Sequence, residues 1–313
     1  MKGAKWVGCF VLALAACILV YAAGCRRTDG AIDFTQSQPQ QAQTSSTAEA
    51  PLRIAFASVI SPKETRQSYQ IIVNYIARKQ GRPAVLIQRR SYEELNKLMS
   101  SGGADIAFFS TGAYCAYQNV PPAELLAMAE TSGSVYYSTY LITGADTDIT
   151  DFSQLQGRTF AFTDPLSYSG RLAVDSLLSE RGTSASTYFK RFFYTYNHDK
   201  SIWAVANHLA DGASIDSQIY DFVRQTNPQL CQQIRIFAVL PEAPTGPVIM
   251  RRDLPEQEKD KLRQIFYTMH TDPSLQEAMK SIQIDAFVPP VPGAYDELRR
   301  QYALRMHRTG RPE

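Results

Sequence analysis

Short apolar runs typical of β-strands alternate along this chain with apolar stripes of helical spacing. Residues 158–162 alternate as a half-buried strand does, and an apolar helical stripe then begins at Leu172 and is ended by Gly182. The stretch between them, residues 163–170, has the sequence T-D-P-L-S-Y-S-G. The pattern therefore predicts a strand-to-helix turn at this point.

The same alternation of elements divides the chain after residue 51 into two α/β halves. We expect strands at residues 52–57, 84–88, 104–109, 158–162, 192–196, 212–215 and 234–240, with helices between them. A β-rich segment at 135–142, a returning strand at 248–250 and helices near 256–269, 274–281 and 294–306 complete the pattern. We expect Pro241 to end the strand that precedes it.

These elements predict a two-lobed α/β clamshell with a ligand cleft between the lobes. One lobe comprises residues 51–143 and 244–313, the other comprises residues 144–243, and extended segments near Tyr140 and Pro244 join them. Ligands gather beyond the carboxyl ends of the strands in open parallel sheets. We therefore expect the cleft to be lined by the loops at 58–65, 110–112, 163–170 and 197–201.

Residues 1–24 have the pattern of an export signal, in which a short basic head precedes an apolar run and small residues. The box A-A-G-C at 22–25 is similar to a bacterial lipoprotein cleavage site, although Ala22 stands where Leu is usual. We expect Cys25 to carry the lipid and residues 25–50, rich in Gln, Ser, Thr and Ala, to form a flexible tether. A plain secretory signal and an uncleaved anchor helix are the alternatives.

Composition narrows the classes of function. A formal net charge of +2 and 20% charged residues give no sign of a nucleic-acid binder. Four His and no C-x-x-C spacing argue against a metal site, and no cofactor is expected. Two cysteines lie in the signal and Cys25 is the expected lipidation site, which leaves Cys115 and Cys231. These two could form one disulfide or be two buried free thiols. Without a nucleophile elbow, a Walker loop or a zinc motif, we expect a binding protein with no catalytic residues.

The turn at 163–170 has the chemistry of an anion site. Ser167 and Ser169 bring hydroxyls to the start of a helix, where free backbone N–H groups and the positive end of the helix dipole favour an oxyanion. An ordinary Ser cap of the helix is the alternative.

Four motifs occur in order along the chain: A-D-I-A-F-F-S-T-G-A-Y at 104–114, D-P-L-S-Y-S-G at 164–170, N-H-D-K-S-I-W-A-V-A at 197–206 and A-D-G-A-S-I-D-S at 210–217. With these motifs the chain resembles the periplasmic substrate-binding proteins of phosphonate, phosphite and phosphate ABC importers, from about residue 52 to 302. The resemblance implies a type II periplasmic-binding fold. It also implies an oxyanion site made by Ser167, Tyr168, Ser169, Tyr92, Tyr136 and His198.

The chain departs from the family at two places. Tyr168 replaces a Thr of the family's Ser-Thr-Ser run, and Gln218 and Gly246 occupy the positions where family members that take aminoalkylphosphonates carry acidic residues. A ligand ammonium without a carboxylate partner would be penalised in a closed cleft. The resemblance therefore favours a smaller ligand at a site that includes Gln218.

The resemblance implies an extracytoplasmic, lipid-anchored protein that captures phosphate, phosphite or a phosphonate for an ABC importer. Its partners would be the oxyanion, the permease and, through lipidated Cys25, a membrane at the periplasm or cell surface. A ligand-binding sensory subunit of a membrane histidine kinase, for a phosphorus or arsenic oxyanion, is the alternative. In that case the thiol of Cys115 could contact a soft oxyanion, although a small buried apolar residue is the simpler interpretation of it.

Overall fold

The computed structural model describes residues 50–57, 59 and 62–309. The predicted signal peptide (1–24), the lipidation site Cys25 and the predicted tether up to residue 49 lie outside the described residues. Among the helices that are described, none combines the length and the apolar character needed to cross a membrane.

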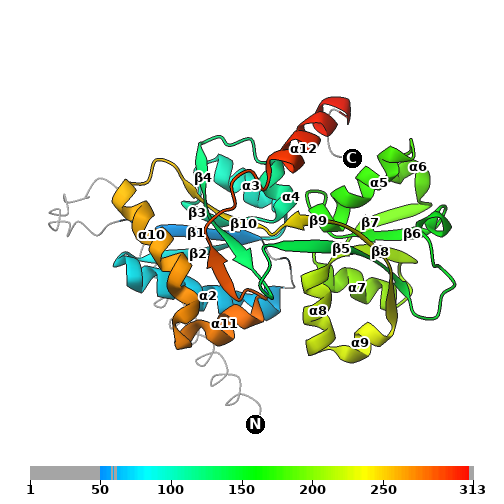
Figure 1. Ribbon diagram of the computed structural model, residues 1–313, viewed down its shortest axis with the longest axis horizontal. Coiled ribbons are helices and arrows are strands. Elements are labelled where there is room, and N and C mark those ends of the chain that lie inside the picture. The colour runs from blue at the N-terminus through cyan, green and yellow to red at the C-terminus, as the bar shows by residue number, and fades with distance from the viewer. Residues whose placement is uncertain (1–49, 58, 60–61, 310–313) are drawn as a thin grey trace, which may run out of the picture. The chain divides into compact units, whose positions relative to one another are not determined.

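The first sheet has six strands in the order β11-β4-β10-β3-β1-β2 (Figure 1). Its strands are β1 (Leu52–Ala57), β2 (Ala84–Arg89), β3 (Ile106–Phe108), β4 (Ala123–Glu130), β10 (Pro247–Arg251) and β11 (Ala286–Val288). Strands β1, β2 and β3 are parallel, whereas β10 runs antiparallel to β3 and β4 and returns the chain from the second half. Its helices are α2 (Pro62–Gln80), α3 (Tyr92–Ser100), α4 (Thr111–Ala116), α10 (Glu256–Thr268), α11 (Gln276–Ser281) and α12 (Asp296–Thr309).

The second sheet has five strands in the order β7-β6-β8-β5-β9. They are β5 (Tyr136–Gly144), β6 (Thr159–Phe162), β7 (Arg191–Tyr194), β8 (Gly212–Asp216) and β9 (Ile234–Pro244). Strands β6, β7 and β8 are parallel, and β5 lies antiparallel between β8 and β9. A π-helical turn (Tyr168–Leu172) leads into α5 (Ala173–Glu180), followed by α6 (Ala185–Tyr188), α7 (His198–Ala206), α8 (Ser217–Thr226) and α9 (Pro228–Gln232).

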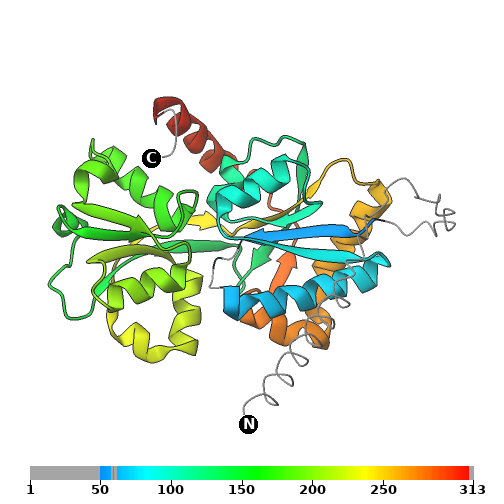
Figure 2. The ribbon, with the colours of Figure 1, turned by 180° about the vertical axis from the view of Figure 1, so that it is seen from behind.

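Helices cover both faces of each sheet, as Figures 1 and 2 show. Ile54 and Phe56 on β1 pack into one apolar core with α2, α10 and α11, whereas Ala55 and Ala57 pack into a second core with α3 and α4. Successive side chains of a strand point to opposite faces, so a strand covered on both faces is apolar throughout. The near-continuous apolar character of these strands follows from that burial.

Two expectations about the junction of the halves were wrong. Residues 136–143, expected in the first lobe, form most of β5 and belong to the second sheet. The chain instead crosses near Val135 and Thr245, where the Thr245 N–H donates to the Val135 carbonyl at 2.9 Å. Strand β9 also continues through Pro241 to Pro244, because β9 is an edge strand and a proline there removes no ladder hydrogen bond.

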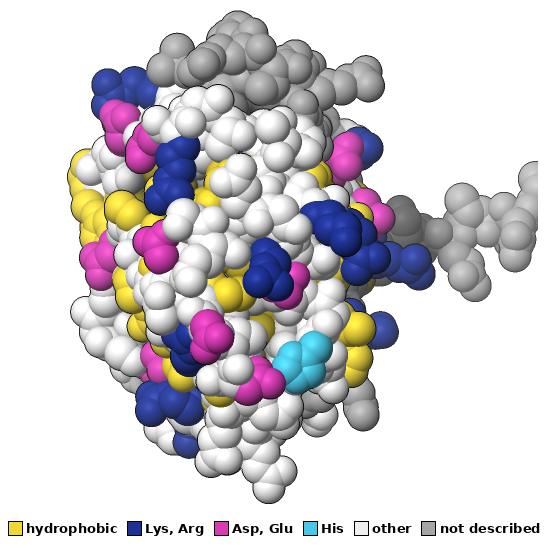
Figure 3. All heavy atoms as spheres, turned by 90° about the vertical axis from the view of Figure 1, so that its right-hand side faces the viewer, with side chains coloured by type: hydrophobic (Ala, Val, Ile, Leu, Met, Phe, Trp, Pro, Cys, Tyr) yellow, Lys and Arg dark blue, Asp and Glu magenta, His cyan; other side chains and the backbone are white. Residues whose placement is uncertain are grey.

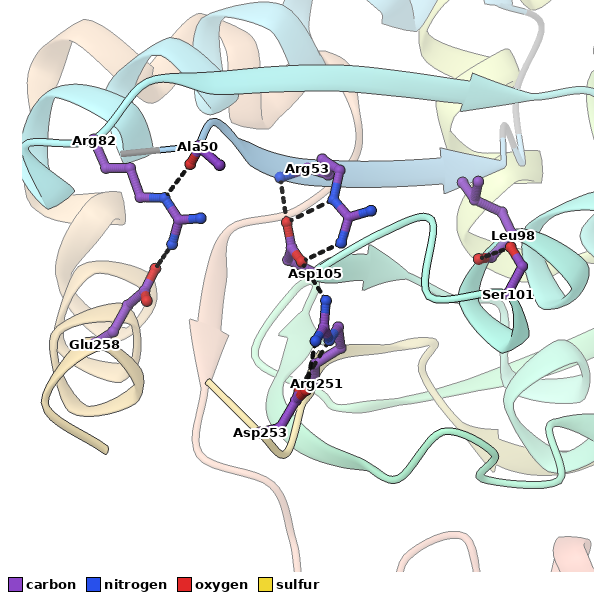
Figure 4. A network of polar contacts seen from close by, with 9 residues as sticks. All are labelled: Ala50, Arg53, Arg82, Leu98, Ser101, Asp105, Arg251, Asp253 and Glu258. Atoms are coloured by element: carbon purple, nitrogen blue, oxygen red, sulfur yellow. Dashed lines mark hydrogen bonds and ion pairs between the residues drawn. The ribbon is translucent and has the colours of Figure 1, made fainter. Parts of the chain in front are cut away.

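A partly buried ionic network joins β1, β3 and β10 at the edge of the sheet opposite the carboxyl ends of its parallel strands (Figure 4). Asp105 accepts hydrogen bonds from the Arg53 backbone N–H at 2.8 Å and from Arg53 Nη2 at 2.6 Å, and Arg251 Nη1 donates to it at 3.1 Å. Burial opposes ionisation of Asp105, but the hydrogen bonds from Arg53 outweigh it and hold the pKa of Asp105 below its ordinary value. The network holds these three strands together, and their opposite ends reach the candidate ligand-binding site.

Charges of both signs are interspersed over the end of the second half shown in Figure 3. The exposed ion pairs of this half, such as Arg158 with Asp211 and Arg224 with Asp221, are of the surface kind that contributes little to stability. No strongly basic face is present among the side chains seen there.

Candidate ligand-binding site

A cavity of about 100 Å³ lies where the carboxyl ends of the parallel strands of the two sheets meet. Ala57 at the end of β1 and Phe108 at the end of β3 line it from the first sheet, and Asp216 at the end of β8 lines it from the second. This is the position at which ligands gather in open α/β sheets. The volume has room for several water-sized groups, which is the scale of a small molecule.

The turn that follows β6 supplies two buried serines to this cavity. Ser167 has extended backbone angles (φ −71°, ψ 131°), and its Oγ accepts a hydrogen bond from the Gly170 N–H at 3.0 Å, so it caps the helix. Ser169 is 1% exposed, and its Oγ has no hydrogen-bond partner among the described residues. Ser167 thus fits the interpretation of the turn as a helix cap, whereas the hydroxyl of Ser169 is left without a described partner.

His198 begins α7 and presents a neutral ring to the cavity. The N–H of Asp216 donates to its Nδ1 at 3.1 Å, and Thr163 Oγ1 lies 3.1 Å from the same nitrogen. Because Nδ1 accepts a hydrogen bond from a backbone N–H, the ring proton is placed on Nε2. Burial lowers the pKa of His198 to about 3, so the ring stays neutral and Nε2–H is a donor at neutral pH.

Two tyrosines line the cavity with protonated hydroxyls. Tyr92, at the start of α3, is 1% exposed, and no described residue forms a hydrogen bond with its Oη. Tyr137 lies on β5, and its hydroxyl is near those of Thr111 and Ser169, which oppose the larger effect of burial on its pKa. Burial raises the pKa of both tyrosines well above the ordinary value, so both hydroxyls remain able to donate.

Two hydrogen bonds donated by backbone N–H groups join the two halves beside these side chains. The Tyr92 N–H donates to Asp164 Oδ2 at 3.2 Å, and the His198 N–H donates to the Val59 carbonyl at 3.1 Å. Asp164 is 1% exposed, and its other oxygen accepts the Leu166 N–H at 2.8 Å. These bonds hold elements of the two halves in register around the cavity.

The structure does not bring Tyr136 and Tyr168 to this cavity. Tyr136 is 38% exposed because side chains alternate along β5, so that its neighbour Tyr137 points inward. Tyr168 lines a separate, smaller cavity with Cys115 and residues of α12, and its ring meets that of Tyr137 edge-on at 6.4 Å. Tyr137 therefore lines the cavity where Tyr136 was expected, and of the turn's three expected residues the two serines line it without Tyr168.

Gln218 lines the cavity as expected, and the carboxyl of Asp216 lies beside it. Sequence reasoning missed Asp216, although it closes β8 within the motif A-D-G-A-S-I-D-S. Its Oδ1 accepts hydrogen bonds from the N–H groups of Gln218 at 2.7 Å and Ile219 at 3.4 Å, so it caps α8. Gly246 packs so closely on the Phe109 carbonyl that a Cβ would lie 2.1 Å from that oxygen.

Much of the remaining wall is apolar and comes from the first half, although Thr131, Thr245 and Gln283 also line the cavity. Its apolar members share large side chains: Tyr69, Phe108, Val248, Ile282 and Phe287. Among the described residues that line the cavity there is no Lys or Arg. An anion in the cavity would therefore be held by uncharged donors, on a wall that suits an apolar substituent.

Cys115 lies outside this cavity, and burial raises the pKa of its thiol to about 12. Cys115 and Cys231 are both buried free thiols, which resolves the alternative of a disulfide. A protonated thiol is a poor ligand for a soft oxyanion.

Comparison with known proteins identifies the family. The family described as "ABC transporter, phosphonate, periplasmic substrate-binding protein" matches residues 54–295. The phosphonates-binding periplasmic protein of Escherichia coli (strain K12) is 24% identical over 243 residues, which cover 75% of this chain and 70% of that protein.

Two solved structures have the same fold at low sequence identity. A binding protein component of an ABC phosphonate transporter from Pseudomonas aeruginosa is 21% identical, with a TM-score of 0.75 over 84% of this chain and 88% of that chain. PhnD1 from Prochlorococcus marinus in complex with methylphosphonate is 14% identical, with a TM-score of 0.73 over 81% of this chain and 98% of that chain. The expected two-lobed type II periplasmic-binding fold is confirmed.

Proposed function

Because this chain belongs to the family of periplasmic substrate-binding proteins of phosphonate ABC transporters, we propose that it captures a small phosphorus oxyanion in the cavity between its two sheets. The anion is held by the hydroxyls of Ser169, Tyr92 and Tyr137 and by Nε2 of His198, with Gln218 beside them. The loaded protein then delivers the oxyanion to the permease of the importer.

One observation carries this proposal: two buried hydroxyls that face the cavity lack a partner. Ser169 Oγ and Tyr92 Oη form no hydrogen bond with any described residue. Leaving a buried polar group unpaired costs about 1–3 kcal/mol, so such groups need a reason. An oxyanion that accepts hydrogen bonds from both removes that cost, and it requires donors that stay protonated, as these do.

The wall chemistry favours a small ligand with a non-polar fourth substituent. Gln218 and Gly246 carry no charge, and the one carboxyl among the described lining residues, Asp216, spends an oxygen on the cap of α8. An ammonium group would have one oxygen of Asp216 as its only acidic partner and would otherwise be buried among uncharged groups. We therefore place phosphite and simple alkylphosphonates ahead of 2-aminoethylphosphonate.

A thermal-shift screen followed by calorimetry tests the proposal. A ligand that binds only the folded state raises the melting temperature. We expect methylphosphonate or phosphite to give the largest rise, 2-aminoethylphosphonate a smaller one and sulfate, as the control anion, none. No rise with any phosphorus oxyanion, or an equal rise with sulfate, would contradict the proposal.

We do not extend the proposal to a sensory subunit for arsenic oxyanions. A thiol was the only feature of the sequence that pointed to arsenic, and Cys115 lies in a different cavity with a thiol that stays protonated.

We also propose that lipidated Cys25 anchors the protein outside the cytoplasmic membrane and that residues 26–50 hold it off the surface. The A-A-G-C box and the polar stretch after it support this. Wild-type protein should sediment with membranes, whereas Cys25→Ala should be released in soluble form. Identical fractionation of the two proteins would refute the anchor without affecting the binding site.

A further inference from the structure

Asp216 is the one carboxyl among the described residues that line the cavity, and one of its two oxygens accepts no hydrogen bond from them. Its Oδ1 accepts the two N–H bonds that cap α8, and its backbone N–H donates to His198 Nδ1. No described residue donates a hydrogen bond to Oδ2. A cap needs only one carboxylate oxygen, so the second oxygen is available to a ligand.

No cation faces this carboxyl within the described part of the chain. The titratable groups that interact with it are His198 from α7, Tyr92 from α3, and Tyr137 and Tyr140 from β5. The imidazole is neutral, and burial raises the pKa of each phenol, so all four groups are uncharged at neutral pH. An ionised Asp216 and a dianionic ligand would thus repel each other with nothing between them but neutral dipoles.

From this juxtaposition we propose that Asp216 and the bound oxyanion share one proton, so that Asp216 determines which protonation state of the ligand is bound. The inference rests on the proposed function. In one description the protonated carboxyl donates to a dianion, and in the other a monoanion donates its P–OH to the Oδ2 of an ionised carboxylate. Both contain the same atoms and the same total charge, so the pair titrates as a unit.

Burial supports this arrangement in the empty cavity. It raises the pKa of Asp216 to about 7, against the weaker opposing effect of the two capping N–H bonds. The second ionisation of a phosphoryl group falls in the same region, at about 6 for a phosphate monoester. Near neutral pH one proton is therefore available from either partner, and binding requires little net proton uptake.

Above about pH 8 both free partners have lost that proton, and the complex must take it from solution. The apparent Kd should then rise roughly tenfold for each pH unit. This behaviour separates the proposal from two others. Above about pH 8, where the ligand is fully ionised, a carboxyl that only caps α8 would give an affinity independent of pH. A carboxylate that binds a ligand ammonium would favour 2-aminoethylphosphonate.

The test is calorimetry with methylphosphonate between pH 6 and 9.5, in two buffers of different ionisation enthalpy so that proton uptake can be counted. Asp216→Asn retains an oxygen for the cap of α8 but carries no charge. Asp151→Asn is the matched control, because Asp151 also caps a helical turn, through Ser153, away from the cavity. Unfolding curves on each variant establish that it is folded.

We expect wild type and Asp151→Asn to take up about one proton at pH 9 and to lose affinity as the pH rises. Asp216→Asn should take up none, keep a nearly constant Kd, and bind about tenfold more tightly than wild type at pH 9. Binding by wild type without proton uptake, uptake that persists in Asp216→Asn, or tighter binding of 2-aminoethylphosphonate that is lost in Asp216→Asn would overturn the inference alone. No binding of any phosphorus oxyanion at any pH would remove the proposed function, and the inference with it.

Discussion

Each half of the molecule contains a strand-to-helix turn with a capping serine beside the cavity, and the two turns differ in what they leave unpaired. After β3, Ser110 Oγ accepts the Ala113 N–H at 3.3 Å, and Thr111 Oγ1 donates to the Pro244 carbonyl at 2.7 Å. After β6, Ser167 Oγ accepts the Gly170 N–H at 3.0 Å, but Ser169 Oγ has no described partner. A serine oxygen that caps a helix accepts one hydrogen bond and keeps its O–H as a donor. Of the serines named here, only Ser169 in the second turn has a hydroxyl with no described partner of either kind.

The two turns also touch each other. A Cβ on Gly112, in the first turn, would lie 2.1 Å from the Leu166 carbonyl oxygen and 2.7 Å from the Tyr168 nitrogen of the second. Only a glycine allows this approach, because real Cβ atoms do not come so close to backbone atoms. The donors of the second turn are therefore held against the wall supplied by the first.

The largest effect is expected from separating the turns. Gly112→Ala places a Cβ against immobile backbone, so the turns must move apart and the donors from the two sheets no longer converge on one anion. We expect affinity for methylphosphonate to fall more than about a hundredfold, measured by calorimetry. Gly103→Ala is the control, since its Cβ first meets the end of the flexible Leu98 side chain. Unchanged binding by Gly112→Ala would show that contact between the turns is unimportant.

The second expected effect is a pH dependence of stability. The second turn contains a buried acid, Asp164, and the first turn has no counterpart to it. Burial raises the pKa of Asp164 to about 6, against about 3.9 in an unfolded chain. Its contribution to stability is therefore fully present below about pH 4 and is lost as the pH rises through about 6, by about 3 kcal/mol in total. Between about pH 4 and 8, the free energy of unfolding of wild type should therefore fall by about 3 kcal/mol more than that of Asp164→Asn.

Urea unfolding of both proteins at several pH values measures this difference. The contribution of buried His198 is present in both proteins and cancels. A difference that stays constant with pH would mean that Asp164 titrates normally in the folded protein.

The third expected effect is the direct comparison of the serines. Ser169→Ala removes a hydrogen bond to a charged ligand worth about 1.5–3 kcal/mol, so affinity should fall roughly ten- to a hundredfold with little change in stability. Ser110→Ala should instead cost about 0.5–2 kcal/mol of stability and leave affinity nearly intact. Calorimetry and unfolding on the same two variants decide the matter. Equal affinity for both variants would remove the distinction between the turns.

The smallest expected effect tests which tyrosine of β5 joins the second turn. The hydroxyl of Tyr137 lies near those of Thr111 and Ser169, and we expect Tyr137→Phe to weaken binding by about 0.5–1.5 kcal/mol, or two- to tenfold. Tyr136→Phe should bind as wild type does. The opposite result would place the side chain of Tyr136 in the site.

Most elements could be predicted from the sequence because their signals are local. Gly81 and Gly182 end helices as expected, and the turn at 163–170 follows a strand and begins a helix. Among the elements that were missed or misassigned, two show the influence of non-local contacts. Strand β11 has only three residues, and the sheet to which β5 belongs is decided by its pairing with β8 and β9, far away in sequence.

The site was harder to predict than the fold. Tyr136 and Tyr137 are adjacent, and a shift of one residue along a strand exchanges the inward and outward side chains. Asp216 has the sequence signature of a helix cap, and nothing local shows that this residue also lines a cavity. The same limit applies to Ser169, because a free hydroxyl is defined by the partners that tertiary structure fails to supply.

The most direct test of the central claim is a crystal structure of the protein with methylphosphonate. We predict that phosphonyl oxygens lie within hydrogen-bond distance, about 2.5–3.2 Å, of Ser169 Oγ, Tyr92 Oη and His198 Nε2. The methyl group should face the apolar wall that includes Phe108. An anion bound elsewhere, such as the surface pocket beside His270 and Lys280, or bound in the cavity without contact to Ser169 Oγ, would contradict the claim.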